Sequence, residues 1–237
     1  MKIVTMIRIM MAFVFALILL PERVLAGEKT LSFTRFNRFV GEGIDEGVGP
    51  VHVTHGEVEF GDFAAEVEWL SGESVNFNEI VMGLFYTLPM LPWDATFGGA
   101  AIGVHEDDDW EDLEVELFIE NSLELPAGFG LSHMIFFNSG EEAFFSEFLL
   151  EGDLPVAPEA VEIAPFILLG VDHGLVDEDN GFTVNHMEFG ADFTYEIGET
   201  SLFLFNGVSG IVPLKGLSDL DEDDAHMVYH MGLGFSL

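Results

Sequence analysis

The chain closes with the stretch Ala225-His-Met-Val-Tyr-His-Met-Gly-Leu-Gly-Phe-Ser-Leu237, in which large apolar residues alternate with polar or small ones. Side chains of a β-strand point to its two faces in turn, so one face of this stretch is apolar and the other carries His226 and His230. A chain that ends inside such a strand has to pair it, and in a closed barrel the last strand pairs with the first. The stretch therefore predicts a closed β-barrel with an apolar, lipid-facing exterior. The apolar face consists of Met227, Tyr229, Met231, Leu233, Phe235 and Leu237.

The opposite end of the chain has the three parts of a secretory signal peptide. Lys2 and Arg8 are basic, an apolar run follows, and Val24-Leu25-Ala26 supplies a cleavage site. We expect residues 1–26 to be a cleaved signal peptide and residues 27–237 to form one β domain. The apolar run is about half as long as the ~20 residues of a membrane-spanning helix, which disfavours an uncleaved anchor.

The composition combines strong acidity with high apolar content. There is no cysteine, and 43 Asp and Glu against 7 Lys and Arg give a formal net charge of −36. A disulfide framework and a thiolate metal site are excluded, and so is a nucleic-acid binder, because phosphates require basic partners. The 24 Phe argue against the disorder that charge alone would suggest. Strand alternation keeps the two properties on separate surfaces.

Period-two runs bounded by Gly, Pro, Asn or Asp predict twelve strands. An even number is typical of bacterial single-chain barrels. The expected fold is all-β, a single closed antiparallel up-and-down transmembrane β-barrel in the bacterial outer membrane. Alternation is weaker over 97–104 and 161–171, where we expect a less defined register. The expected spans are 31–40, 50–60, 62–70, 75–88, 93–105, 110–121, 127–138, 142–151, 159–173, 182–197, 200–209 and 225–237.

The connections between these spans sort by parity. The connections after the fifth, seventh, ninth and eleventh strands are acidic, as at 106–109 and 219–224, although 71–74 in the same set is short and Pro50 and Pro213 also lie in this set. Most of the others are short and rich in Pro or Gly, as at 89–92 and 125–128. Alternate connections of an up-and-down barrel lie at opposite ends, and outer-membrane barrels have their longer loops outside. We therefore expect the acidic connections to share the outer rim.

Taken together, these features resemble small twelve-stranded porins of the TorF type. The resemblance rests on the signal peptide, the hairpin rhythm over 31–237, the segments Asn78-Glu79-Ile80 and Leu113-Glu114-Val115-Glu116-Leu117, and the aromatic C-terminal end. It implies an outer-membrane pore with no catalytic residues. Leu237 stands where such barrels usually have a terminal Phe, although Phe235 keeps a ring on the same face.

In a closed barrel the polar faces of the strands line the interior. A negative lining attracts cations and repels anions. Adaptation to a saline habitat would give the same acidity, and the two explanations are compatible. Bulky inward residues such as Phe118 and Phe136 would narrow the interior. The candidate pore-lining residues are Glu66, Glu68, Glu114, Glu116, Glu188, Asp192, Glu196, His186, His226 and His230.

The acidic connections offer weak candidates for a divalent-cation site. Asp219, Asp221 and Asp223 have the i, i+2, i+4 spacing of oxygen ligands, and 177–181 resembles the start of a calcium loop. Both lack the closing bidentate Glu of an EF-hand, so a solvated charge run is the simpler interpretation. We predict no cofactor.

Sequence motifs of hydrolases are absent. Neither Gly-x-Ser-x-Gly nor His-Glu-x-x-His occurs in the chain. We therefore interpret the histidines as hydrogen-bonded interior residues, and we expect that the protein is not an enzyme.

The expected function is passive diffusion of small hydrophilic solutes or cations through an acidic lumen. One rival is a structural or adhesion barrel, without conductance, whose outer loops bind divalent cations. A second rival is a periplasmic soluble β protein, which would have to bury a second apolar face. The expected partners are outer-membrane lipids, the solutes themselves and the barrel-assembly machinery, which would contact the C-terminal strand; the sequence leaves the oligomeric state open.

Overall fold

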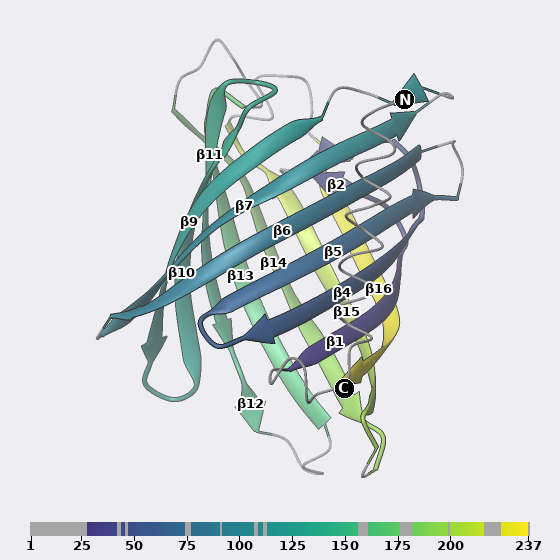
Figure 1. Cartoon of the computed structure of the whole chain (residues 1–237), viewed down its shortest axis with the longest axis vertical. Coiled ribbons are helices and arrows are strands. Elements are labelled where there is room, and N and C mark those ends of the chain that lie inside the picture. Colours follow the sequence, from purple (N-terminus) through teal and green to yellow (C-terminus); the bar gives the residue numbers. More distant parts are fainter. Residues whose placement is uncertain are drawn as a thin grey trace.

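The computed structural model describes residues 28–41, 44–45, 47–73, 77–90, 92–106, 109–110, 113–155, 161–175, 182–198, 200–215 and 224–236. Within these residues, twelve long strands form a tilted ring (Figure 1). They are β1 (Lys29–Phe36), β4 (Val51–Phe60), β5 (Phe63–Gly72), β6 (Phe77–Met90), β7 (Trp93–Glu106), β9 (Glu114–Leu125), β10 (Phe129–Asn138), β11 (Ala143–Gly152), β13 (Val161–His173), β14 (Thr183–Glu196), β15 (Leu202–Pro213) and β16 (His226–Ser236).

The ring closes in the way that the C-terminal sequence predicts. Each long strand pairs antiparallel with its neighbours along the chain, and β16 pairs with β1 from Thr30↔Ser236 to Phe36↔His230. The pairing of β11 with β13 completes the circle between the two halves of the chain. We call the end that holds Lys29 and Ser236 the turn end, and the opposite end the loop end. The predicted closed antiparallel barrel of about twelve strands is confirmed.

Four short strands were not predicted. β2 (Val40–Gly41) pairs with β3 (Ile44–Asp45) in the connection between β1 and β4. β8 (Asp109–Trp110) pairs with the loop end of β7, and β12 (Leu154–Pro155) pairs with β13. Two-residue strands leave too little sequence for an alternation pattern to be detected.

The first long strand ends at Phe36 instead of the predicted residue 40, because Asn37 takes over its hydrogen bonding. The Asn37 side-chain amide donates to the Met227 carbonyl at 3.0 Å, and its oxygen accepts from the Tyr229 amide at 2.7 Å. This side chain replaces backbone ladder bonds, so the chain can leave the sheet here. At another boundary, Pro213 ends β15 instead of lying in a connection, because a missing N–H is tolerated at a strand end. β9 also differs, since it spans Glu114–Leu125 instead of the predicted 110–121.

The outward face of the ring is apolar. Leu117 and Ile119 on β9 are 56% and 47% exposed, and they alternate with the less exposed Glu116 and Phe118. Monomeric soluble proteins rarely expose a contiguous apolar surface of this extent, whereas a lipid-facing barrel wall requires one. No helix among the described residues is long and apolar enough to cross a membrane. Further exposed outward residues are Phe33, Trp69, Phe97, Ile135, Phe148, Phe189, Leu204, Tyr229 and Met231.

Glycines on the inward face make room for phenylalanine rings, which explains the weak alternation over 97–104. A Cβ atom on Gly98 would collide with the Phe118 ring from the neighbouring strand. The ring of Phe205 lies over Gly232 in the same way. Over 161–171, alternation is weak because both faces of β13 are apolar, and a register shift follows Gly170.

Gly190 allows a direct test of this close packing. A Cβ atom there would lie 2.5 Å from the Val208 carbonyl oxygen, which is backbone and has little freedom to move. We expect Gly190→Ala to destabilise the folded barrel by about 1–3 kcal/mol, the usual cost of overpacking. Gly130→Ala is the matched control, because its nearest neighbour is the flexible Glu151 side chain at 3.6 Å. Urea unfolding followed by gel mobility measures the difference, and equal stability of the two variants would contradict the close approach.

Candidate functional site

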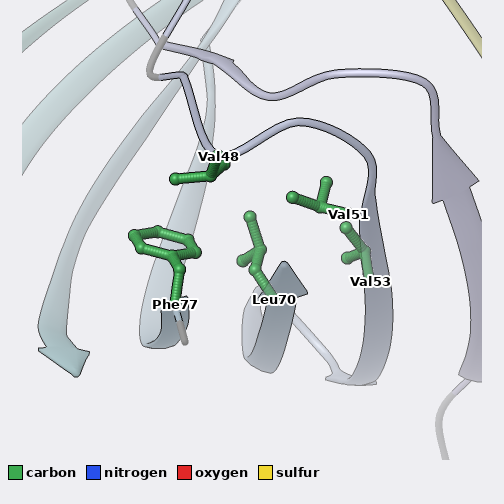
Figure 2. Close-up of a cluster of buried hydrophobic side chains, with 5 residues drawn as sticks. All are labelled: Val48, Val51, Val53, Leu70 and Phe77. Atoms are coloured by element: carbon green, nitrogen blue, oxygen red, sulfur yellow. The ribbon is translucent and has the colours of Figure 1, made fainter. Parts of the chain in front are cut away.

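The connection between β1 and β4 folds back into the loop end of the barrel. Its residue Val48 is 5% exposed and packs in a cluster with inward residues of β4, β5 and β6 (Figure 2). Phe39, from the same connection, packs against this cluster. The mouth is therefore narrowed by apolar contacts on this side. The wall residues of the cluster are Val51, Val53, Leu70 and Phe77, with Phe36 and Val104 beside them.

The same connection brings a basic side chain into the interior. Arg38 Nη1 lies 3.0 Å from Nδ1 of His226 on β16. The three remaining basic residues of the domain lie elsewhere: Lys29 begins β1 at the turn end, Arg35 is on the outward face of β1, and Lys215 is exposed just after β15. Arg38 is thus the one Lys or Arg that lines the cavity described next.

Arg35 points away from the interior and binds at the loop-end rim. Its Nε donates to Glu73 Oε1 at 2.6 Å, and His52 Nε2 lies 3.0 Å from the same oxygen. The Arg35 hydrogen bond holds the pKa of the Glu73 carboxyl below its ordinary value. Because Arg35 and His52 bind Glu73 at the rim, they do not neutralise the carboxylates of the interior.

Below the folded-back connection lies a cavity of about 520 Å³ inside the barrel. Six adjacent strands form its wall, from β5 through β4, β1, β16 and β15 to β14. Two of the predicted lining residues face it from opposite ends of this arc: Glu68 on β5 and Glu188 on β14. Phe36 and Phe205 contribute aromatic rings, and Arg38, Phe39 and Val40 contribute the covering side.

Two predicted carboxylates pair with histidines. Glu66 Oε2 lies 3.4 Å from His55 Nε2, and Asp192 Oδ1 lies 3.5 Å from His230 Nε2. The second pair spans an intervening strand, because Gly207 stands between the two residues in the register and has no side chain. A Cβ atom on Gly207 would collide with both.

A second group of carboxylates lies on β9, β11 and β14. Asn138 Nδ2 donates to Glu114 at 2.9 Å and to Glu116 at 3.2 Å. Glu147 is close enough to both Glu116 and Glu188 for their charges to interact. Three strands therefore direct carboxylates toward one region of the interior, and the amide of Asn138 partly compensates their charge.

The other predicted lining residues lie on the inward face but farther from the cavity. His186 is 3% exposed and stacks on Phe145 with ring centroids 6.2 Å apart. Glu196 is the last residue of β14 and is exposed at the turn end. Arg38 and Glu147 were not among the predicted lining residues. Arg38 falls inside the predicted strand 31–40 but follows the end of β1 in the structure. Glu147 is flanked on β11 by Phe145 and by apolar residues of both faces.

The turn end has its own acidic mouth. A cavity of about 400 Å³ there is lined by Asp94, Glu120, Glu124 and Glu151, together with small residues such as Ser122. In the described part of the chain, no group of His, Asp and Glu is arranged to hold a metal ion. The weak metal candidates Asp219, Asp221 and Asp223 lie outside the described residues.

One serine–histidine contact joins β11 and β13. Ser146 Oγ and His173 Nε2 lie 2.9 Å apart. Strand alternation places Ser146 on the outward face of β11, however, because Phe145 and Glu147 point inward. This contact therefore does not reach either cavity.

Comparison with solved structures shows the same fold. The KdgM porin superposes with a TM-score of 0.60 at 6% sequence identity, covering 88% of this chain and 99% of that chain. The KdgM porin in complex with disordered oligogalacturonate gives a TM-score of 0.58 at 7% identity, with the same coverage. The NanC porin gives 0.56 at 10% identity, covering 87% of this chain and 100% of that chain. No protein-family model and no curated protein matches the sequence. At these identities the likeness concerns the fold, and the TorF-type resemblance stays a prediction.

Proposed function

We propose that this protein is an outer-membrane channel through which small hydrophilic solutes or cations diffuse passively. The observation that carries the proposal is an apolar barrel exterior around an interior in which carboxylates greatly outnumber basic side chains. Rings of acidic side chains favour cations and disfavour anions in a pore. The proposed lining comprises Glu66, Glu68, Glu114, Glu116, Glu188, Asp192, Glu196, His186, His226 and His230, to which we add Glu147 and Arg38.

Two further observations support the proposal. The neighbours in fold, KdgM and NanC, are both porins, which favours a channel over an enzyme. Oligogalacturonate is bound by KdgM and is not assigned to this protein. Acidic cavities lie at both ends of the described interior, so a cation would meet carboxylates along the path.

Planar-bilayer recording of the refolded protein tests the proposal. Under a KCl gradient we expect discrete conductance steps and a reversal potential on the side that indicates K⁺ over Cl⁻ selectivity. The triple variant Glu116→Gln/Glu147→Gln/Glu188→Gln should move the reversal potential toward zero. Glu141→Gln, in the exposed turn between β10 and β11, is the matched control and should leave it unchanged.

The outcomes separate the parts of this proposal. Absence of conductance from correctly folded protein would overturn the channel, and a reversal potential favouring Cl⁻ would overturn the cation preference. If the triple variant conducts with the wild-type reversal potential, these three carboxylates do not determine the ion selectivity. Acidity as an adaptation to a saline habitat would then be the better explanation of the composition.

The apolar packing of Val48 and Phe39 in the loop-end mouth favours one alternative, a barrel that does not conduct. In that case the acidic outer connections, including Asp219, Asp221 and Asp223, would serve as an interaction surface for divalent cations. Calcium titration of the folded protein, monitored calorimetrically, tests this second function independently of conductance.

A further inference from the structure

We propose that the cavity under the folded-back connection is a binding site for organic cations that combine an ammonium group with an apolar body. This inference names a substrate class for the proposed channel and rests on that function only for its role in transport. Its basis is the chemistry of the cavity wall, which differs from that of the turn-end mouth.

The size of the cavity suits a small organic molecule. Its volume of about 520 Å³ lies within the 300–1,000 Å³ range of typical ligand sites. A bare inorganic cation would leave most of this space to water and would contact few of the apolar side chains. An apolar group attached to the cation would contact them, and each buried methylene contributes about 0.8 kcal/mol in general.

The wall provides two carboxylates in separate places. Glu68 and Glu188 stand at opposite ends of the six-strand arc that encloses the cavity. The hydroxyl of Ser209 hydrogen-bonds to Glu188 and helps to orient it. Glu68 faces His55 in the strand register, while His55 itself contacts Glu66. An ammonium group between these walls would find a carboxylate on either side.

Aromatic rings cover the wall between the carboxylates. Phe36 and Phe205 both lie against His230, with ring centroids 5.0 Å and 6.2 Å from the imidazole. The Phe205 ring occupies the space that Gly232 leaves by lacking a side chain. Ring faces attract cations within about 6 Å, and they also accept apolar groups.

Arg38 sets the polarity of the site. It lines the covering side of the cavity, and its guanidinium is directed to His226 at 3.0 Å. One positive charge at this side repels the ammonium group toward Glu68 and Glu188 on the walls. The cavity is thereby suited to a ligand with a single charged end, and the remaining apolar lining of Val51, Val53, Leu70, Ile211 and Val228 is available for its body.

The turn-end mouth lacks aromatic rings and serves as an internal control. Its cavity is lined by four carboxylates and by aliphatic side chains such as Leu123, but by no Phe ring. It should concentrate cations by charge, without the ring faces that attract an ammonium group in the first cavity.

The test is isothermal titration calorimetry on the refolded, full barrel in detergent, with benzyltrimethylammonium as the probe. We expect saturable binding in a background of KCl, and no binding of benzyl alcohol, which has the ring without the charge. Glu68→Gln and Glu188→Gln should each weaken binding about tenfold, as the loss of one opposed charge near the ligand predicts. Glu124→Gln, at the turn-end mouth, should leave the affinity unchanged.

Several results would overturn the proposal. They are the absence of saturable binding, equal binding of benzyl alcohol, or an equal loss of affinity in the Glu124→Gln control. Heat-modifiable gel mobility verifies that every variant is folded before titration. The channel and the site fail separately: a barrel that conducts without binding the probe loses only the site, and one that binds without conducting loses only the transport role.

Discussion

Releasing the folded-back connection from the loop-end mouth is expected to raise single-channel conductance severalfold. Val48 and Phe39 anchor this segment against the inward faces of β4, β5 and β6. Burying one large apolar side chain stabilises a structure by about 1.5–3 kcal/mol. The double variant Phe39→Ser/Val48→Ser removes both anchors, and a change of that size is enough to shift the segment from a mostly packed to a mostly released population.

The variant is designed to keep the barrel itself intact. Neither residue belongs to a strand of the ring, so its backbone ladder is unchanged. Glu141→Ser in the exposed turn between β10 and β11 controls for a general effect of altered loops. Replacement of residues 38–49 by a short Gly-Ser linker provides a second variant with the same expectation. Wild-type conductance in both would mean that the segment does not restrict the path.

The closed ring of strands can be predicted from the sequence, but only some of the residues that fill its interior can. Closure follows from a C-terminal strand that alternates to its end, and the observed β1–β16 register matches that expectation. The folded-back connection has no such periodic signal. Val48 is an isolated apolar residue between Gly47 and Gly49, which both adopt positive φ values near 70°. The turn chemistry is visible in the sequence, but the surface that receives Val48 comes from three strands that only the fold brings together.

Pairing between side chains was equally hidden from the sequence. Alternation places Asp192 and His230 on inward faces, but their contact depends on the register of β15 between them and on the missing side chain of Gly207. Glu147 was missed because large apolar residues occupy both faces of β11, as Phe144 and Phe145 illustrate. An interior that is partly aromatic weakens the polar-inside pattern from which lining residues are inferred.

A charge placed on the outward face is expected to destabilise the barrel strongly. Ile119, in the middle of β9, is 47% exposed and lies beside the exposed outward residues Phe97 and Ile135 in the strand register. If this face contacts lipid, Ile119→Arg should lower the free energy of unfolding in vesicles by about 2–4 kcal/mol, the cost of a basic residue near the bilayer midplane. A soluble protein would tolerate the same change within about 0.5 kcal/mol, because an exposed Arg remains hydrated.

A substitution at the adjacent residue, Glu120, shows whether the effect depends on the outward face of β9 or on the strand as a whole. Glu120→Arg introduces the same side chain one position further on, but toward the acidic turn-end mouth lined by Glu124 and Glu151. There the new charge is attracted by carboxylates, so we expect stability to be unchanged or raised. Urea titration of both variants folded in phosphocholine vesicles measures the difference. Opposite responses of the two variants are expected only if β9 separates hydrocarbon on one face from a hydrated, negatively charged interior on the other. Equal tolerance of the two substitutions would therefore contradict a lipid-facing exterior and favour the soluble β protein instead.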